Sequence, residues 1–237
     1  MVKIYKKYKS YLINSILYFT YKKELTFGTF TFKFRNSKLS PGIKYYLSKH
    51  ISNYEYGERI LVERLIKNND VVIEAGTSIG ILSGLISNII GKNGKLITLE
   101  GDENLSIIAK SINKFNHNIL FISGALTFNN EKYVSFDKDG WLGGKISHNN
   151  DELKVRAFNL LDLCHKYSAN ALVIDIEGSE VGFFDIIIPQ SINKIIIELH
   201  PHIYGEDLLE KLIQFFINQK FCFYNQVESV YSFTREL

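Results

Sequence analysis

The sequence predicts an α/β fold in which a mostly parallel, seven-stranded sheet has helices on both faces and an antiparallel last strand. Two observations predict it. Continuous runs of β-branched residues alternate with helical segments, which is typical of βαβ units. The chain then ends in two short strands that are too close together for a crossover helix, so they form a hairpin. With 46% apolar residues, a chain of 237 residues can bury the core that such a sheet requires.

A small basic appendage, residues 1–42, precedes the main domain, which we place at residues 43–237. Residues 1–50 hold 11 of the 28 Lys and Arg residues and one acid, so this part carries +10 and the remainder −7. The apolar middle of segment 1–23 is too short for a membrane span and lacks a cleavage site. A basic helix lying peripherally on the inner membrane surface, and a helix packed on its own domain or on a second subunit, both remain open.

A strand follows that helix, because Phe30, Phe32 and Phe34 alternate with polar residues. Phe27 is out of step, and Gly28 beside it indicates a bulge or turn. A helix over residues 43–68 comes next. The strands are then expected at 70–76, 95–100, 118–124, 171–178, 194–200, 221–225 and 230–234, and the helices at 81–90, 103–115, 160–167 and 207–219.

Residues 126–156 interrupt this alternation. Three glycines flank the only tryptophan, Trp141, so the segment is either a hairpin extension or an aromatic flap over a substrate. The two cysteines, Cys164 and Cys222, lie far apart in apolar stretches. We expect reduced core thiols and a cytoplasmic protein.

The first strand of the main domain ends in a charge and a glycine turn, VVIEAGTSIG. Gly76 permits a tight turn, and Gly80 allows the next helix to pack closely. A dinucleotide site needs a third glycine where Ser78 stands, and Glu74 would place an anion beside any pyrophosphate. The turn therefore favours a ligand with a positive group, such as the ammonium and sulfonium of S-adenosylmethionine, over a nicotinamide cofactor.

Polar or small residues also follow the next two strands. Glu100 lies 24 residues beyond Gly76, about where a carboxylate binds ribose hydroxyls, although acids at strand ends are often only solvated. The third strand ends in Ser123, Gly124 and Ala125, which leave room for an adenine ring or form an ordinary turn.

The fourth and fifth strands end in the residues that we associate with chemistry. Asp175 directly follows a buried run, whereas Glu177 and Glu180 can be read as acids at a helix N-terminus. Glu198 and His200 alternate after the fifth strand, so they share a face while the strand lasts.

The segments VVIEAGTSIG, LITLEGDE, ALVIDIEGSE and IIIELH, in this order, resemble the FkbM family of class I S-adenosylmethionine-dependent methyltransferases over residues 52–200. The resemblance implies a Rossmann-like methyltransferase sheet, S-adenosylmethionine as cofactor, and methylation of hydroxyl oxygens, often on sugars of surface polysaccharides or on natural products. The family pattern carries over to cofactor-binding residues Tyr54, Glu55, Glu74, Gly76, Thr77, Ser78, Gly80, Glu100, Gly101, Gly124, Ala125 and Asp175. Two family residues, an Asn in the first turn and a Lys before the fourth-strand Asp, are absent.

A hydroxyl is a poor nucleophile, so a base or a metal has to deal with its proton. We expect Asp175 or His200 to be the catalytic base, with Trp141, Glu177, Glu198 and His200 around the acceptor. A Mg²⁺ ion held by Asp175 and Glu198 is the rival device and is not favoured. A non-catalytic binding module is the other function class. Nucleic acid is not a favoured acceptor, since the fourth strand ends in DIEG and not in Pro-Pro-aromatic.

Overall fold

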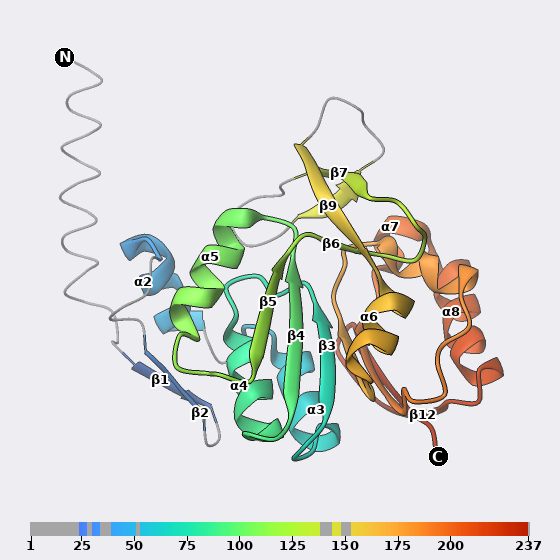
Figure 1. The fold of residues 1–237 in the computed structure, drawn as a ribbon, viewed down its shortest axis with the longest axis horizontal. Helices are drawn as coiled ribbons and strands as arrows, with labels where there is room; N and C mark the ends of the chain where they lie inside the picture. The colour runs from blue at the N-terminus through green and yellow to red at the C-terminus, as the bar shows by residue number, and fades with distance from the viewer. Residues whose placement is uncertain are drawn as a thin grey trace.

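The computed structural model describes residues 24–27, 30–33, 39–50, 53–137, 144–147 and 153–236. Its centre is a seven-stranded sheet (Figure 1). The order is β12 (Cys222–Val227), β13 (Val230–Thr234), β11 (Lys194–Glu198), β10 (Ala171–Ile174), β3 (Val71–Ala75), β4 (Lys95–Glu100) and β5 (Ile119–Ser123). The strands from β11 to β5 are parallel, and β13 runs antiparallel to both of its neighbours. The predicted sheet and its reversed last strand are confirmed.

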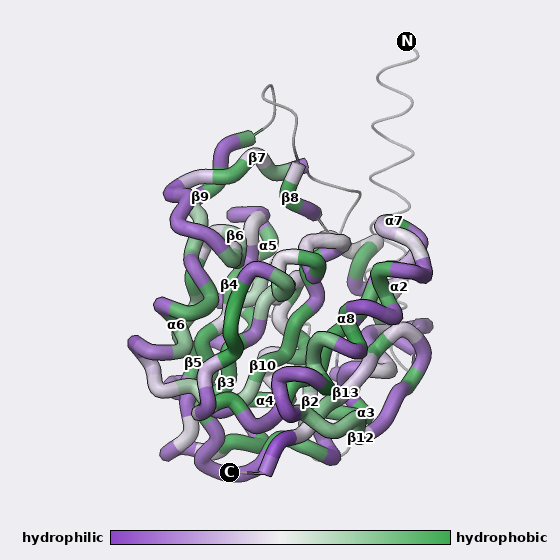
Figure 2. The backbone as a smooth tube through the Cα atoms, turned by 90° about the vertical axis from the view of Figure 1, so that its right-hand side faces the viewer, coloured by the Kyte–Doolittle hydropathy of each residue, from purple (hydrophilic) through white to green (hydrophobic). Residues whose placement is uncertain are grey.

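Helices cover both faces of this sheet. On one face, α6 (Leu160–Tyr167), α8 (Glu206–Asn218) and the 3₁₀ helix η2 (Ser179–Asp185) pack on side chains such as Ile73 and Ile174. On the other, α3 (Tyr56–Leu65) and α4 (Ile81–Ile90) pack on side chains such as Val72 and Val173. Helix α5 (Glu103–Ile112) lies beside β4 and β5. Hydrophobic stretches accordingly mark the central strands in Figure 2.

A second, smaller sheet lies beyond the carboxyl ends of the central strands (Figure 1). It consists of β6 (Ala125–Thr127), β9 (Leu153–Asn159), β7 (Tyr133–Asp137) and β8 (Lys145–Ser147), in that order. The described part of the interruption is therefore a sheet extension. Trp141 lies outside the described residues.

The N-terminal strands β1 (Glu24–Phe27) and β2 (Phe30–Lys33) pair antiparallel, with Phe27 opposite Phe30. Phe32 is buried against Leu47, Ile81 and Leu105, so the hairpin packs on the main domain. Segment 1–23, Gly28 and Phe34 lie outside the described residues.

The single helix expected over residues 43–68 is wrong. Two helices, α2 (Pro41–His50) and α3, stand there, and Glu55 between them adopts a left-handed backbone with φ 47°. A helix cannot continue through that conformation. The expected strand over 194–200 also ends early, at Glu198, because His200 precedes the short helix α7 (Pro201–Tyr204).

Cys164 is buried as expected, but Cys222 is exposed, which makes the core assignment of that thiol wrong. Cys222 lies on β12, at the edge of the sheet, where water reaches the strand. Within the described ranges no helix has the length and apolarity needed to span a bilayer.

Candidate active site

Two adjoining cavities lie at the carboxyl ends of the central strands. The first, about 60 Å³, lies between the ends of β3, β4 and β5 and the small sheet. The second, about 650 Å³, extends from there past β10 and β11 to the start of α3. Ser78, Lys145, Asp175 and Glu177 border both cavities. The second volume falls within the usual range of ligand sites, roughly 300–1,000 Å³.

The backbone around these cavities is held in conformations that are unfavourable for ordinary residues. Ser78 (φ 48°), Glu177 (φ 49°) and Glu55 all lie in the left-handed region. Such conformations cost on the order of 1 kcal/mol each and gather at binding sites. Gly76 has φ 90°, and a Cβ there would lie 2.0 Å from the carbonyl oxygen of Asp175. This glycine lets the first turn and the end of β10 approach each other.

Glu100 borders the first cavity and is fixed by backbone amides. The Ser78 N–H donates to its Oε2 (2.7 Å) and the Asp102 N–H to its Oε1 (2.8 Å). Burial outweighs these bonds and raises the pKa of Glu100 to about 7. Gly101, Gly124 and Ala125 line the same cavity, and with Gly76, Ser78 and Asp175 they bring seven predicted cofactor residues together.

Phe136 of β7 was not singled out from the sequence, yet it narrows the first cavity. A Cβ on Gly101 would meet its ring at 2.4 Å, and one on Gly144 would meet it at 2.5 Å. The sequence shows only that Phe136 is an aromatic residue within the segment that interrupts the sheet pattern. That observation does not indicate which part of the site its ring covers.

Three predicted cofactor residues, Glu74, Thr77 and Gly80, do not border either cavity. Glu74 is 1% exposed and faces α4, where its Oε2 accepts hydrogen bonds from Ser83 (2.5 Å) and Thr98. Its Oε1 has no hydrogen-bond partner, and burial raises its pKa to about 7. Thr77 is also buried, and its hydroxyl donates to the Leu99 carbonyl (2.8 Å).

Gly80 is the last of these three residues, and it lets the turn after β3 pack against α5. A Cβ there would meet Ala109 at 2.8 Å. Glu74, Thr77 and Gly80 therefore shape the turn from beneath, whereas Gly76 and Ser78 form the surface of the first cavity.

Tyr54 and Glu55 border the second cavity. The Tyr54 hydroxyl lies 3.1 Å from Ser78 Oγ, which connects the segment before α3 with the first turn. Glu55 Oε2 is buried without a hydrogen-bond partner, and burial, followed by the charges of Glu58 and Glu74, raises its pKa well above its ordinary value. A carboxyl group in this state is stabilised by a cationic ligand.

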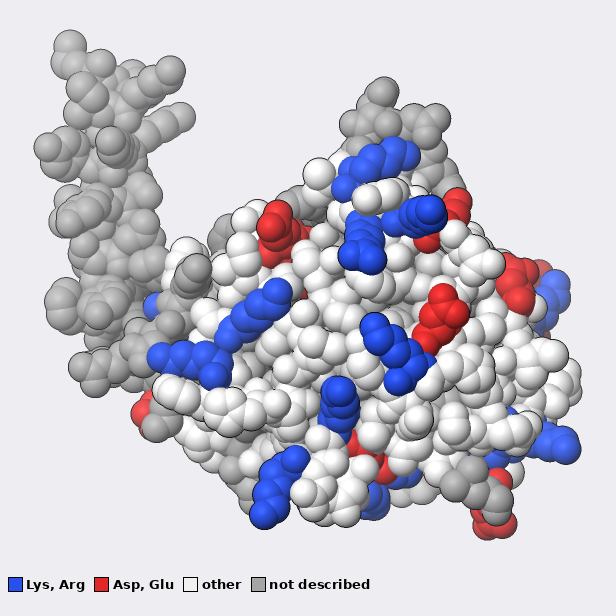
Figure 3. Space-filling model, in the orientation of Figure 1, with Lys and Arg blue, Asp and Glu red and all other residues white. Residues whose placement is uncertain are grey.

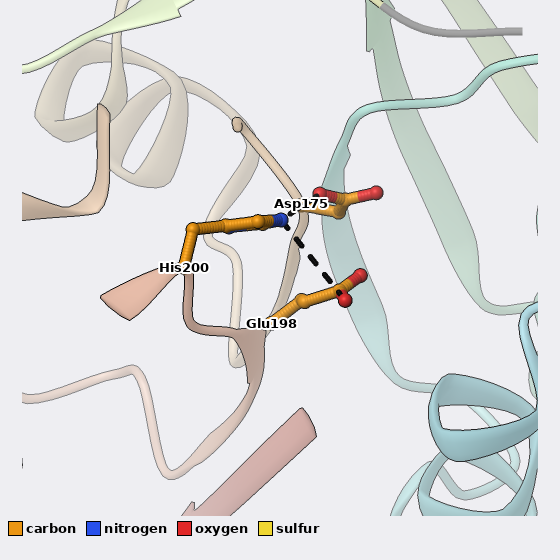
Figure 4. Close-up of side chains that lie close together, drawn as sticks. All are labelled: Asp175, Glu198 and His200. Carbon is orange, nitrogen blue, oxygen red and sulfur yellow. Dashed lines mark ion pairs between the residues drawn. The ribbon is translucent and has the colours of Figure 1, made fainter. Parts of the chain in front are cut away.

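His200 stands at the centre of a group of acids, with two of them shown in Figure 4. Its Nδ1 hydrogen-bonds Glu180 Oε1 (2.9 Å). Its Nε2 lies 3.4 Å from Glu177 Oε2, 3.7 Å from Asp175 Oδ1 and 4.0 Å from Glu198 Oε1. Burial alone would lower the pKa of His200, but the hydrogen bond and charge of Glu180, with Asp175 and Glu177, raise it to about 9.

Glu180 lies in the first turn of η2, which agrees with its interpretation as an acid at a helix N-terminus, and its side chain is completely buried. Its Oε1 also accepts a hydrogen bond from the Gly178 N–H (3.0 Å). Since it holds the Nδ1 side of His200, it directs Nε2 toward the cavity acids.

The second cavity is strongly acidic. Glu58, which the sequence did not single out, hydrogen-bonds Glu198, and burial together with that neighbour raises its pKa to about 8. The described residues that line this cavity include two basic side chains, Lys145 and His202. The acidic ones are more numerous: Glu55, Glu58, Asp175, Glu177, Glu198 and Glu228. The cavity therefore favours positively charged ligands.

No protein-family model matches the chain. Over 75 residues it is 33% identical to the protein-L-isoaspartate O-methyltransferase of Methanococcus aeolicus, a match covering 31% of this chain and 35% of that protein. The chain thus matches about a third of the length of this curated relative.

Two solved structures are similar in outline. Aeropyrum pernix fibrillarin in complex with S-adenosyl-L-methionine is 11% identical, with a TM-score of 0.46 over 74% of this chain and 71% of that chain. The precorrin-6y C5,15-methyltransferase of Geobacter metallireducens is 13% identical, with a TM-score of 0.47 over 76% and 87%. The strand order itself, with β13 reversed between β11 and β12, decides the fold. It is the class I methyltransferase fold.

Proposed function

We propose that this protein is an S-adenosylmethionine-dependent O-methyltransferase that acts on a hydroxyl group. The observation that carries the proposal is the acidic second cavity, which adjoins the narrow cavity at Glu100 and Gly101. S-adenosylmethionine has a neutral adenosine half and a methionine half with a sulfonium and an ammonium group. The two cavities match these halves.

Each half has candidate contacts. Glu100 binds the ribose hydroxyls, and Gly124 and Ala125 leave space for adenine. Because the Phe136 ring narrows the first cavity, we expect it to shift or to stack on the base as the cofactor enters. Tyr54 and Glu55 lie at the methionine end.

Methyl transfer forms a bond from the acceptor oxygen to the methyl carbon and breaks the bond from that carbon to sulfur, which keeps the electron pair. The hydroxyl proton must leave to a base. Of the two candidates, Asp175 suits this role better, since its Oδ1 has no hydrogen-bond partner and the residue borders both cavities. While no metal ion is bound to it, His200, whose pKa is raised to about 9, carries a proton at neutral pH and contributes positive charge. Alignment of oxygen, carbon and sulfur supplies roughly 7–11 kcal/mol in favourable cases.

The acceptor we favour is a sugar hydroxyl of a surface polysaccharide or glycoconjugate, in line with the FkbM resemblance. Small natural products with hydroxyl groups are the alternative. The relative from Methanococcus aeolicus is named for a carboxylate acceptor, the isoaspartyl group. A carboxylate would be repelled by Glu177, Glu198 and Glu228 around the second cavity, which favours a neutral hydroxyl.

Nucleic acid remains a disfavoured acceptor for the same electrostatic reason. On the face shown in Figure 3, Lys and Arg side chains are spread over several places and interspersed with acids. A phosphate backbone is normally bound by a continuous basic stripe.

The test is a transfer assay with methyl-labelled S-adenosylmethionine against nucleotide sugars, glycans, hydroxylated small molecules and RNA. We expect label on a hydroxylated acceptor. Asp175→Asn should lower turnover at least about 100-fold while cofactor affinity changes little. Glu210→Gln, on the exposed face of α8, is the matched control. Cofactor binding without transfer to any acceptor would favour a non-catalytic binding module, and full activity of both Asp175→Asn and His200→Ala would refute the catalytic assignment.

A further inference from the structure

The geometry points to a divalent-cation site formed by Asp175, Glu198 and His200, and we propose that this protein binds one such ion there. These three residues come from the ends of two neighbouring strands, and one ligand atom from each lies within 4.8 Å of the others (Figure 4). The binding itself is independent of the proposed function, but the role that we give the ion rests on it.

The distances suit an ion better than they suit direct contacts. His200 Nε2 lies 3.7 Å from Asp175 Oδ1 and 4.0 Å from Glu198 Oε1, which is too far for hydrogen bonds. A transition-metal ion sits about 2.0–2.2 Å from nitrogen and oxygen ligands, so two ligands of one ion lie at most about 4.4 Å apart. Small side-chain movements bring all three atoms into that range.

One atom of this group lacks the partner that burial demands. Asp175 Oδ1 is buried with no hydrogen-bond partner. The His200 side chain is 6% exposed, and its Nε2 lies 3.7 Å from this oxygen and 3.4 Å from Glu177 Oε2. Buried polar atoms are normally satisfied, so Asp175 Oδ1 indicates a missing ligand beside Nε2.

The surroundings of His200 are those of a metal-binding histidine. Glu180, fully buried, holds the Nδ1 side at 2.9 Å, which fixes the ring and makes Nε2 the donor atom. Ser229 Oγ donates to Glu198 Oε1 (2.6 Å) and fixes that carboxylate in the same way. Ligands oriented by such neighbours bind metal more tightly.

One imidazole and two carboxylates suit Mn²⁺ or another first-row divalent ion better than Ca²⁺, which prefers oxygen ligands alone. In the methyl-transfer reaction the ion would contact the acceptor oxygen and favour loss of its proton. Asp175 would then be a ligand of the ion, and this arrangement would replace the one above in which Asp175 itself takes the proton. Glu177, whose Oε2 lies 3.4 Å from the same Nε2, would be the carboxylate that receives the proton.

The test is titration of the full-length protein, freed of metal by chelation and desalting, with Mn²⁺, followed by calorimetry and by the electron paramagnetic resonance of free Mn²⁺. We expect one ion per chain. Glu198→Gln, whose side chain is 24% exposed and tolerates the change, should weaken binding at least about tenfold, as should His200→Gln. Glu228→Gln removes a charge from the same cavity outside the three ligands and should change affinity by less than about twofold.

Absence of stoichiometric binding, or equal losses in Glu198→Gln and Glu228→Gln, would overturn the proposal. Thermal unfolding of each variant separates loss of a ligand from loss of folding. The outcome is distinguishable from that of the proposed function: Mn²⁺ binding without methyl transfer would refute only the function, and methyl transfer that survives chelation, without Mn²⁺ binding, would refute only the ion site.

Discussion

Replacement of Glu74 by Gln should stabilise this protein, and more so as the pH rises. Glu74 is buried beneath α4 and its pKa is raised from 4.5 to about 7. Below pH 4.5 the group is protonated in both the folded and the unfolded state. Between these values the unfolded chain releases its proton while the folded chain keeps it, so stability falls as the pH rises. Above pH 7 the full cost, about 3 kcal/mol, is present.

A glutamine removes this cost and preserves the contacts. Its amide oxygen can accept the hydrogen bonds of Ser83 and Thr98, and its nitrogen takes the place of Oε1, which has no partner. Urea unfolding at pH 4.5 and at pH 8 measures the effect. We expect the two proteins to differ little at the lower pH, and the variant to be more stable by about 3 kcal/mol at the higher. Cofactor affinity should change less than about twofold. Equal stability at pH 8, or loss of cofactor binding, would refute the structural role of Glu74.

Other changes test the packing and the site. Gly76→Ala should lose about 3 kcal/mol or more in urea unfolding, since its Cβ would clash with the Asp175 carbonyl and φ is 90°; a smaller loss would contradict the close approach of the two turns. Lys194→Met leaves the Asp70 carboxylate, 2.6 Å from the lysine Nζ, buried without its charge partner, and should cost about 3 kcal/mol, whereas Lys211→Met on exposed α8 should cost almost nothing. Tyr54→Phe removes the hydroxyl beside Ser78 Oγ and should weaken cofactor binding about fivefold by calorimetry; unchanged affinity would remove Tyr54 from the site.

The sheet was predictable because its signal is local and repeated. Each central strand is a run of β-branched residues bounded by turns, and the final hairpin limits where β13 can lie. The break between α2 and α3 was not predictable in this way. Nothing in the pattern around Tyr54 and Glu55 marks a left-handed residue, and tertiary contacts at the cavity hold it.

The site residues divide according to the face on which they lie. Position at a strand end correctly predicts that Asp175, Glu198 and Glu100 border the cavities. The position of Glu74 follows instead from the alternation of side chains along β3. Glu74 lies on the same face of the sheet as Val72, and α4 covers that face, so Glu74 is buried and does not reach the cavity.

Three features of the site depend on packing between segments that are distant in the sequence. They are the ring of Phe136 over the first cavity, the contact of Glu58 with Glu198, and the contact of Glu180 with His200. Single-sequence patterns carry no information about such pairs. The acids of DIEGSE did stand out as a group, and the structure assigns them different neighbours: Asp175 and Glu177 border the cavity, whereas Glu180 supports His200 from behind.

Calorimetric titration of the full-length protein with S-adenosylmethionine, and with NAD⁺ as the comparison, tests the central claim most directly. A cavity lined by acids beside Glu100 predicts one S-adenosylmethionine per chain, and no binding of NAD⁺, whose pyrophosphate those acids repel. Absence of S-adenosylmethionine binding, or equal binding of NAD⁺, would contradict the account.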